Sequence, residues 1–172
     1  PKLNLVHHKD YIPEQFLPTY NSVVIERYIH KIPGLAEHFV YFNDDFYIIN
    51  NVKTDRFFRN GLPCDIATFL YNPSWSQWYK RIKNNLRKIN RHFDKKEVMR
   101  RDHDKWFDKS YGARARWNYI LRPYGKFITL RTPHNAQPYL KSTFEEVWAV
   151  AGKELTETSV NRFRALNDLT PE

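Results

Sequence analysis

The chain has 172 residues, of which 41% are hydrophobic, so it is long enough for one sizeable core and too short for two ordinary domains. Its 28 Lys and Arg outnumber 19 Asp and Glu, and the net charge of +9 predicts attraction to nucleic acid, anionic membranes, nucleotide diphosphates or acidic polysaccharides. A single cysteine, Cys64, excludes an internal disulfide and a cysteine-rich zinc site, and no apolar run is long enough for a membrane-spanning helix.

The amino-terminal part reads as a strand followed by a helix. Leu3 to Val6 is a short apolar run typical of a buried strand. Asn21 and Ser22 can cap a helix whose apolar residues keep helical spacing, and Pro33-Gly34 would end it. This pattern places Glu26 in the first turns of that helix.

A polar cluster follows the next apolar run. Phe39 to Phe42 is typical of a buried strand, and Phe46 to Ile49 fits a strand that returns as a hairpin. Between them stand Asn43, Asp44 and Asp45. Adjacent carboxylates at a strand end can hold Mg²⁺ or Mn²⁺ against a diphosphate, whereas the plainer interpretation is a turn between two hairpin strands.

From Trp75 to about Arg101 the pattern predicts one basic amphipathic helix, with apolar positions at Trp78, Ile82, Leu86, Ile89 and Phe93. Three interpretations stay open: a packed helix with a solvated cationic face, a surface for an anionic or lipid-linked polysaccharide acceptor, and a surface for nucleic acid. Further elements are a strand at Phe127 to Leu130 and helices at Tyr139 to Ala151 and Ser159 to Leu166, the last capped by Thr158 or Ser159.

Two isolated residues have the chemistry of a phosphate-transfer site. His134 follows a proline and precedes a helix, where an imidazole can accept a proton or donate to a phosphate oxygen. Arg164 can clamp a phosphate through two N–H groups. The plainer interpretations are a structural or surface histidine and a solvated or salt-bridged arginine. No glycine-rich phosphate loop, nucleophile elbow or His-Glu-x-x-His pair is present.

Two long blocks resemble a known family. LPTYNSVVIE (Leu17 to Glu26) followed by HKIPGLAEHFVYFNDDFY (His30 to Tyr47) is similar to the second motif region of the Stealth family. TPHNAQPYLKSTFEEVW (Thr132 to Trp148), continuing to TSVNRFRALND (Thr158 to Asp168), is similar to its third region. This family includes bacterial capsule hexose-1-phosphate transferases and the animal enzyme that begins the mannose-6-phosphate tag on lysosomal hydrolases.

The resemblance implies four catalytic residues and a set of supporting ones. It places the family's functional glutamate on Glu26, its acidic residue on Asp45, its histidine on His134 and its arginine on Arg164. Asn43 and Lys141 are implied as substrate-binding groups, and Asp44 with Asp45 as the ligands of Mg²⁺ or Mn²⁺.

The resemblance also implies a fold and a division of the chain. We expect an α/β fold with a partial Rossmann-like or glycosyltransferase-A-like sheet, flanking helices and a basic helical insertion. Residues 1–50 would hold the second motif region, 51–126 the insertion and 127–172 the third region, together forming one catalytic segment. The family's first and fourth regions have no counterpart in the sequence, so we expect an excerpt whose missing regions come from the rest of the chain or from another chain.

The implied reaction is attack by a glycan hydroxyl on the sugar-bearing phosphorus of a nucleotide-diphosphate sugar, which forms a phosphodiester in capsule or exopolysaccharide synthesis. We expect a cytoplasmic protein, with peripheral association at the inner membrane face left open, and no nucleic-acid partner. Two alternatives remain. One is a basic nucleic-acid-binding module, which the charge and the Trp and Tyr content favour. The other is a catalytically silent part of a larger transferase.

Overall fold

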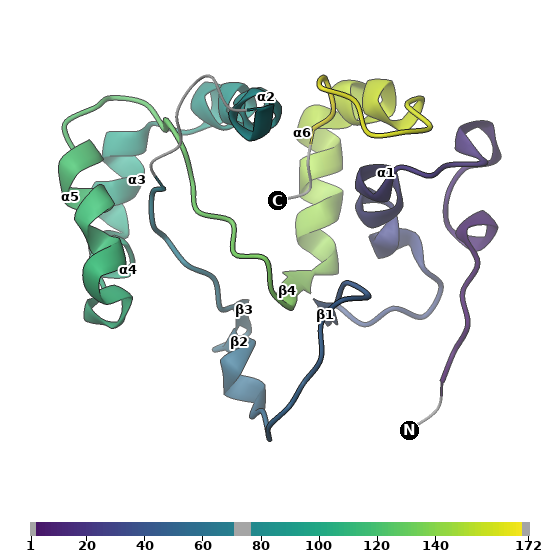
Figure 1. Ribbon diagram of the computed structural model, residues 1–172, viewed down its shortest axis with the longest axis horizontal. Helices are drawn as coiled ribbons and strands as arrows, with labels where there is room; N and C mark the ends of the chain where they lie inside the picture. Colours follow the sequence, from purple (N-terminus) through teal and green to yellow (C-terminus); the bar gives the residue numbers. More distant parts are fainter. Residues whose placement is uncertain (1–2, 71–76, 170–172) are drawn as a thin grey trace. The chain divides into compact units, whose positions relative to one another are not determined.

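The computed structural model describes residues 3–70 and 77–169, which divide into two compact units (Figure 1). Unit 1 comprises Pro1–Asp65 and His134–Pro171, and unit 2 comprises Ile66–Pro133. The mixture of many helices and short strands confirms the coarse α and β expectation. The Rossmann-like sheet is not confirmed, because within the described residues both sheets are two-stranded and antiparallel.

In unit 1 the first helix is capped as predicted. Helix α1 (Ser22–Arg27) begins after Asn21, whose side-chain oxygen accepts a hydrogen bond from the Val23 amide at 3.1 Å. The helix is shorter than its apolar pattern indicates, since it ends at Arg27 and is followed by the 3₁₀ turn η3 (Ile29–Lys31).

The first described strand pairs with a segment far along the chain. Strand β1 (His38–Tyr41) runs antiparallel to β4 (Gln137–Leu140), with Phe39 opposite Tyr139 and their ring centroids 5.8 Å apart. The predicted hairpin strand at Phe46 to Ile49 is wrong, because that segment is irregular. Strand β1 pairs with β4 and not with a hairpin strand, and the Phe39–Tyr139 ring contact stabilises this pairing.

Helix α6 (Lys141–Ser159) follows β4 directly and packs beside α1 (Figure 1). It begins later than predicted and continues through a kink at Ala151. The predicted helix at Ser159 to Leu166 is wrong, because Thr158 and Ser159 end α6 rather than start a new helix. Their hydroxyls donate to carbonyls one turn back, at 3.0 and 2.7 Å, a local bond that competes with helix continuation.

The loop after α6 is held on α1 by buried polar groups. The Asn21 side-chain amide donates to the carbonyls of Asn161 and Phe163 and to the carboxylate of Asp168 at 3.0 Å. Asn21 and Asp168 are both buried. The same carboxylate accepts hydrogen bonds from the Asn161 side chain at 2.7 Å and the Ala165 amide at 2.8 Å. Every partner of Asn21 in this loop is therefore over a hundred residues away in sequence.

Arg27 joins the same elements from the other end of α1. Its buried guanidinium donates to its own helix at Val23 and to the carbonyls of Leu155 and Leu169, at 2.7 and 2.5 Å. Burial lowers the pKa of Arg27 to about 10, and the negative charge of Asp168 opposes that shift. The cation remains charged at neutral pH and connects α1 both to the last turns of α6 at Leu155 and to the segment beyond α6 at Leu169.

The remaining elements of unit 1 are short: η1 (His8–Asp10), η2 (Glu14–Phe16), η4 (Thr54–Arg56), β2 (Phe58–Arg59) and β3 (Leu62–Pro63). Its amino-terminal core contains Ile12, Phe16, Val24 and Tyr28, against which Trp148 of α6 packs. The predicted strand at Leu3 to Val6 is wrong, because the segment has no ladder partner among the described residues and Leu3 is 88% exposed.

Unit 2 is helical. Its helices are α2 (Gln77–His92), α3 (Lys95–Arg101), α4 (His103–Trp106) and α5 (Arg116–Leu121), with the 3₁₀ segment η5 (Lys109–Ala115). The single predicted helix is wrong, since Asp94 separates α2 from α3 by accepting the Glu97 amide at 2.9 Å as an N-cap. Phe93, predicted on the apolar stripe, lies in this break and is 55% exposed. Trp75 and the Trp78 side chain lie outside the described part.

Apolar residues of α2 pack into the core of unit 2, which contains Phe69, Ile82, Leu86, Met99, Trp106 and Phe127. The predicted strand at Phe127 to Leu130 is wrong, because side chains replace a ladder there. The Asn90 amide group donates to the Phe127 carbonyl and accepts from the Phe127 amide, both at 2.8 Å. No described helix is both long enough and apolar enough to span a membrane.

We expect Asn21→Ala to lower the free energy of unfolding by about 2–4 kcal/mol, because it removes a helix cap and leaves the buried Asp168 carboxylate short of a donor. Urea unfolding followed by circular dichroism measures the loss. Asn167→Ala, at an exposed position of the same loop, is the control and should change stability by less than about 0.5 kcal/mol. Equal losses in the two variants would contradict the role of Asn21.

His30 makes stability dependent on pH. Burial lowers its pKa from the ordinary 6.5, Lys31 and Lys141 lower it further, and the bond from Nδ1–H to the Arg27 carbonyl opposes the shift. The unfolded chain therefore binds a proton near pH 6.5 that the folded chain does not.

We expect the free energy of unfolding to fall as the pH drops below about 6.5, by at most about 1.4 kcal/mol per pH unit. His30→Asn, which can still donate to the Arg27 carbonyl, should flatten this slope in urea titrations between pH 7.5 and 5. His92→Asn, at an exposed position, should leave it as in the parent chain. If His30→Asn leaves the slope unchanged, His30 is not the source of the pH dependence.

Candidate active site

The acidic residues after β1 form a tight turn. The Phe46 amide donates to the Asn43 carbonyl at 3.2 Å, so Asp44 and Asp45 occupy the two central turn positions. The chain then continues as irregular structure rather than as a hairpin strand. The turn presents its carboxylates from the end of β1.

The structure brings Asp45 and His134 together from positions 89 residues apart. His134 Nε2 lies 3.3 Å from Asp45 Oδ2, and both side chains are about three-fifths exposed. Because an ionised carboxylate only accepts hydrogen bonds, Nε2 carries a proton in this contact, and in the neutral imidazole the lone pair is then on Nδ1. The Phe46 ring meets the imidazole edge at a centroid distance of 4.7 Å and fixes one side of it.

A hollow of about 590 Å³ adjoins this pair. Its wall includes Asp45 and His134, and Phe42, Phe46 and Phe57 supply apolar surface. Arg56, the last residue of η4, adds a cation to the same lining. The hollow thus combines an acid, an imidazole and a guanidinium within unit 1.

Glu26 is bound by a residue of β1. The Tyr41 hydroxyl donates to the Glu26 carboxylate, and the pKa of Tyr41 is strongly raised, first by burial and then by the charge of Glu26. Asp44 raises it further, so the acidic turn lies within electrostatic reach of the same phenol. Tyr41 therefore stays protonated and holds the Glu26 carboxylate against the end of β1.

Arg164 also docks on α1. Its guanidinium donates to the Ser22 hydroxyl through Nε at 3.1 Å and Nη2 at 2.5 Å. Ser22 is the first residue of α1 and Glu26 is four residues further on, so the two lie on the same helix face. Arg164 is exposed and the loop that carries it is the one Asn21 and Asp168 hold.

Of the four predicted catalytic residues, Asp45 and His134 contact each other, whereas Arg164 contacts Ser22 on the helix that carries Glu26. Tyr41 connects the two, because it binds Glu26 and lies near Asp44. The hollow beside Asp45 and His134 does not include Glu26 or Arg164 in its lining. Convergence of all four on one substrate stays a prediction.

The supporting residues occupy separate places. The Asn43 carbonyl closes the acidic turn, which leaves its side-chain amide for other contacts. Lys141 begins α6, where its amide donates to the Glu37 carbonyl at 2.8 Å and its charge acts on His30 and Glu37. A substrate-binding role for either residue stays a prediction.

The predicted metal site has few protein ligands to offer. The described residues contain no group of three or more His, Cys, Asp and Glu side chains that could hold a metal ion. Asp44 and Asp45 supply two neighbouring carboxylates, and Mg²⁺ is commonly bound by one or two carboxylates together with substrate phosphates. The residues therefore fit a cation that arrives with a diphosphate, but not an all-protein metal cage.

The sequence pattern missed three residues of this region. Tyr41 was part of an apolar strand, where its phenol gives no sign of a carboxylate partner. Ser22 is a cap candidate in the sequence, and nothing in the sequence pattern distinguishes Arg56 from the other cations. The position of Tyr41 just before Asn43 to Asp45 indicates a phenol near the acidic turn, but it does not indicate which carboxylate that phenol binds.

With this geometry in place, comparison with known proteins identifies the family. Residues 1–65 match the Stealth protein conserved region 2. The chain belongs to the Stealth family. The match covers α1, β1 and the acidic turn, and thus the part of the chain that carries Glu26 and Asp45.

Several relatives extend the match along the chain. The exopolysaccharide phosphotransferase cps2G of Lactiplantibacillus plantarum is 39% identical over 170 residues, which are 98% of this chain and 50% of that protein. The capsular polysaccharide phosphotransferase eps5J of Streptococcus thermophilus is 34% identical, over 95% of this chain and 66% of that protein. The Haemophilus influenzae capsular polysaccharide phosphotransferase fcs1 is 32% identical, over 98% of this chain and 40% of that protein. The chain thus spans between 40% and 66% of the length of these relatives.

Proposed function

We propose that the chain carries catalytic residues of a polysaccharide phosphotransferase, which moves hexose-1-phosphate from a nucleotide-diphosphate sugar to a glycan hydroxyl. The observation that carries the proposal is the contact between Asp45 and His134 beside a hollow that also contains Arg56. Relatives named as capsular and exopolysaccharide phosphotransferases support the reaction class.

The acceptor oxygen attacks the phosphorus that bears the sugar. A new P–O bond forms as the bond to the nucleoside monophosphate breaks, and the hydroxyl proton passes to His134 Nδ1. Asp45 accepts the hydrogen bond from Nε2–H, which holds the tautomer with its lone pair on Nδ1 and stabilises the imidazolium that forms. The bond between the sugar and its own phosphate oxygen stays intact.

The other residues position and neutralise charge. Phosphoryl transfer depends chiefly on placement and on charge stabilisation around the transferred group. Arg56 in the hollow and Arg164, which binds Ser22 of α1, are the guanidinium groups assigned to diphosphate oxygens. Tyr41 orients Glu26 toward the acceptor or sugar hydroxyls. Asp44 and Asp45 would hold a bound Mg²⁺ or Mn²⁺, which supplies further neutralisation of the diphosphate.

His134→Ala should lower kcat at least about 100-fold in the full-length protein, because it removes the proton acceptor. Transfer from radiolabelled nucleotide sugars to a glycan acceptor measures the change, with Mg²⁺ present. His92→Ala, an exposed histidine of unit 2, serves as the control and should retain turnover within twofold. Near-normal turnover in His134→Ala would remove the base assignment and with it the proposal in this form.

Arg56→Ala should raise the KM for the nucleotide sugar about 10-fold, since it withdraws a cation from the hollow. Arg59→Ala is the matched control three residues away, because the Arg59 guanidinium binds the Asp55 carbonyl and is not part of the hollow's lining. Steady-state kinetics at fixed acceptor concentration separate the two. Parallel changes in both variants would assign the effect to the loop rather than to Arg56.

A further inference from the structure

One face of α2 carries a line of cations. Lys83, Arg87 and Arg91 follow one another at four-residue spacing, so they stand about 6 Å apart along the helix, and all three are exposed. Helix α2 contains no Asp or Glu. The apolar residues Ile82 and Leu86 face the core instead, which leaves this basic stripe (Lys83, Arg87 and Arg91) to solvent.

The basic stripe borders a hollow of about 400 Å³ in unit 2. Lys126 approaches the hollow from the segment before Phe127 and adds a fourth cation, while Tyr79 and Asn90 supply a ring and an amide. Asn90 is held by its paired bonds to the Phe127 backbone. The cations therefore surround a depression with a fixed base rather than a flat surface.

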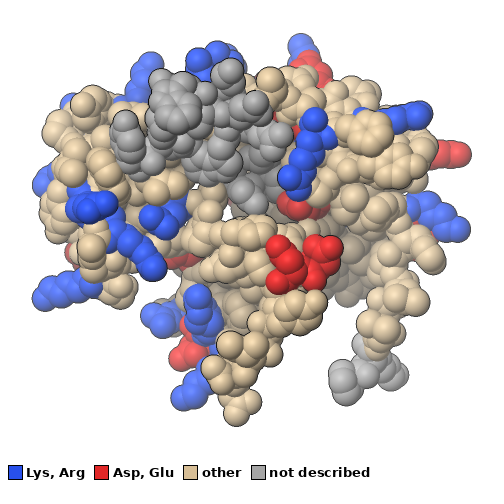
Figure 2. Space-filling model, viewed as in Figure 1, with Lys and Arg blue, Asp and Glu red and all other residues tan. Residues whose placement is uncertain are grey.

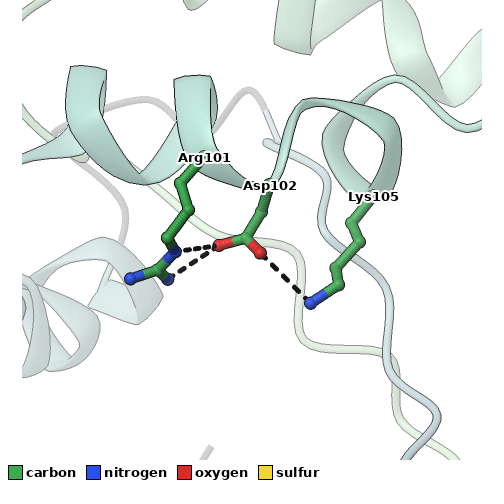
Figure 3. A network of polar contacts seen from close by, with 3 residues as sticks. All are labelled: Arg101, Asp102 and Lys105. Atoms are coloured by element: carbon green, nitrogen blue, oxygen red, sulfur yellow. Dashed lines mark hydrogen bonds and ion pairs between the residues drawn. The ribbon is translucent and has the colours of Figure 1, made fainter.

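These cations are not neutralised by neighbouring acids. Among the described residues no carboxylate forms an ion pair with Lys83, Arg87, Arg91 or Lys126. Elsewhere in unit 2, Arg101 and Lys105 both bind Asp102, at 2.7 and 3.1 Å (Figure 3). Figure 2 shows blue Lys and Arg side chains scattered over unit 2 with little red beside them. Cations left without acids attract an external anion.

We propose that this basic hollow of unit 2 binds phosphodiester groups of the growing polysaccharide. The inference rests on the proposed function, because transfer of hexose-1-phosphate to a hydroxyl leaves a charged phosphodiester in the product. Each addition thus places another anion on the chain that serves as the next acceptor. A line of cations with a ring and an amide at its base matches such an alternation of phosphate and sugar.

Two other anionic partners fit the hollow less well. A membrane-binding amphipathic helix inserts its apolar face into the bilayer, but Ile82 and Leu86 of α2 are buried in the protein core. Nucleic-acid surfaces stack successive bases on exposed rings. Among the described residues that line the hollow, Phe127 is buried and Tyr79 is the one ring with partial exposure.

The test measures binding to the full-length protein of a capsular polysaccharide whose repeats are joined by hexose-1-phosphate diesters. A neutral glucan of the same chain length, a single-stranded oligonucleotide and phosphatidylglycerol vesicles are the comparison ligands. The variants are the triple reversal Lys83→Glu, Arg87→Glu, Arg91→Glu and a milder triple change to Gln. The matched control reverses three exposed cations outside the hollow, by Lys96→Glu, Arg100→Glu and Lys109→Glu. Thermal melting checks that each variant folds.

We expect the triple reversal to weaken binding of the phosphodiester polymer at least 10-fold, the Gln variant to weaken it less, and the control to stay within twofold. The neutral glucan should bind the parent protein at least 10-fold more weakly than the charged polymer. Equal losses in stripe and control variants, or tighter stripe-dependent binding of oligonucleotide or vesicles, overturn the inference. Transfer to a short neutral acceptor by the unmodified protein is measured in parallel, so its absence identifies failure of the proposed reaction instead.

Discussion

The buried hydrogen bond between Asn21 and Asp168 is the contact on which the architecture of unit 1 depends. Asn21 uses its oxygen to cap α1 and its amide to bind the loop beyond α6, so one side chain sets the start of a helix and the path of a distant loop. Arg27 performs the matching task at the other end of the helix. Two polar side chains in a nearly dry environment hold the carboxyl-terminal motif against the amino-terminal one.

The candidate site inherits its geometry from this arrangement. Arg164 reaches Ser22 because the loop around it is fixed by Asp168, and Glu26 stands one turn further along the same helix. The pairing of β1 with β4 places the acidic turn and His134 at one end of a short ladder, since Tyr41 is opposite Gln137. Rigid secondary structure thus positions groups that are themselves exposed, as substrate access requires.

Local sequence signals predicted the elements whose causes are local. The Asn21 cap, the strand at Phe39 to Tyr41 and the approximate position of α6 followed from short-range patterns. The predicted strands at Phe46 to Ile49 and Phe127 to Leu130 failed, because pairing depends on partners far along the chain and Asn90 replaces a ladder. Asp94 was a visible cap signal within the supposed single helix, and the apolar periodicity across it outweighed that signal.

The candidate residues came from motif resemblance rather than from spacing. Periodicity places Glu26 on a helix and Asp45 in a turn, but it carries no information on contacts such as Asp45 with His134, which 89 residues separate. The Tyr41 bond to Glu26 was equally out of reach, because a phenol in an apolar run gives no sign of its partner. Contacts between distant residues are a property of the folded chain and require the structure.

The separation in sequence between Asn21 and Asp168 also sets an order of events during synthesis. When α1 leaves the ribosome, the loop that contains Asp168 and Leu169 has not yet been synthesised. The Asn21 amide and the Arg27 guanidinium therefore lack these partners until then. Unit 2 draws on residues 66–133 alone and can collapse in the interval. The contacts of Asn21 and Arg27 with the loop beyond α6 therefore form only after that loop has been synthesised.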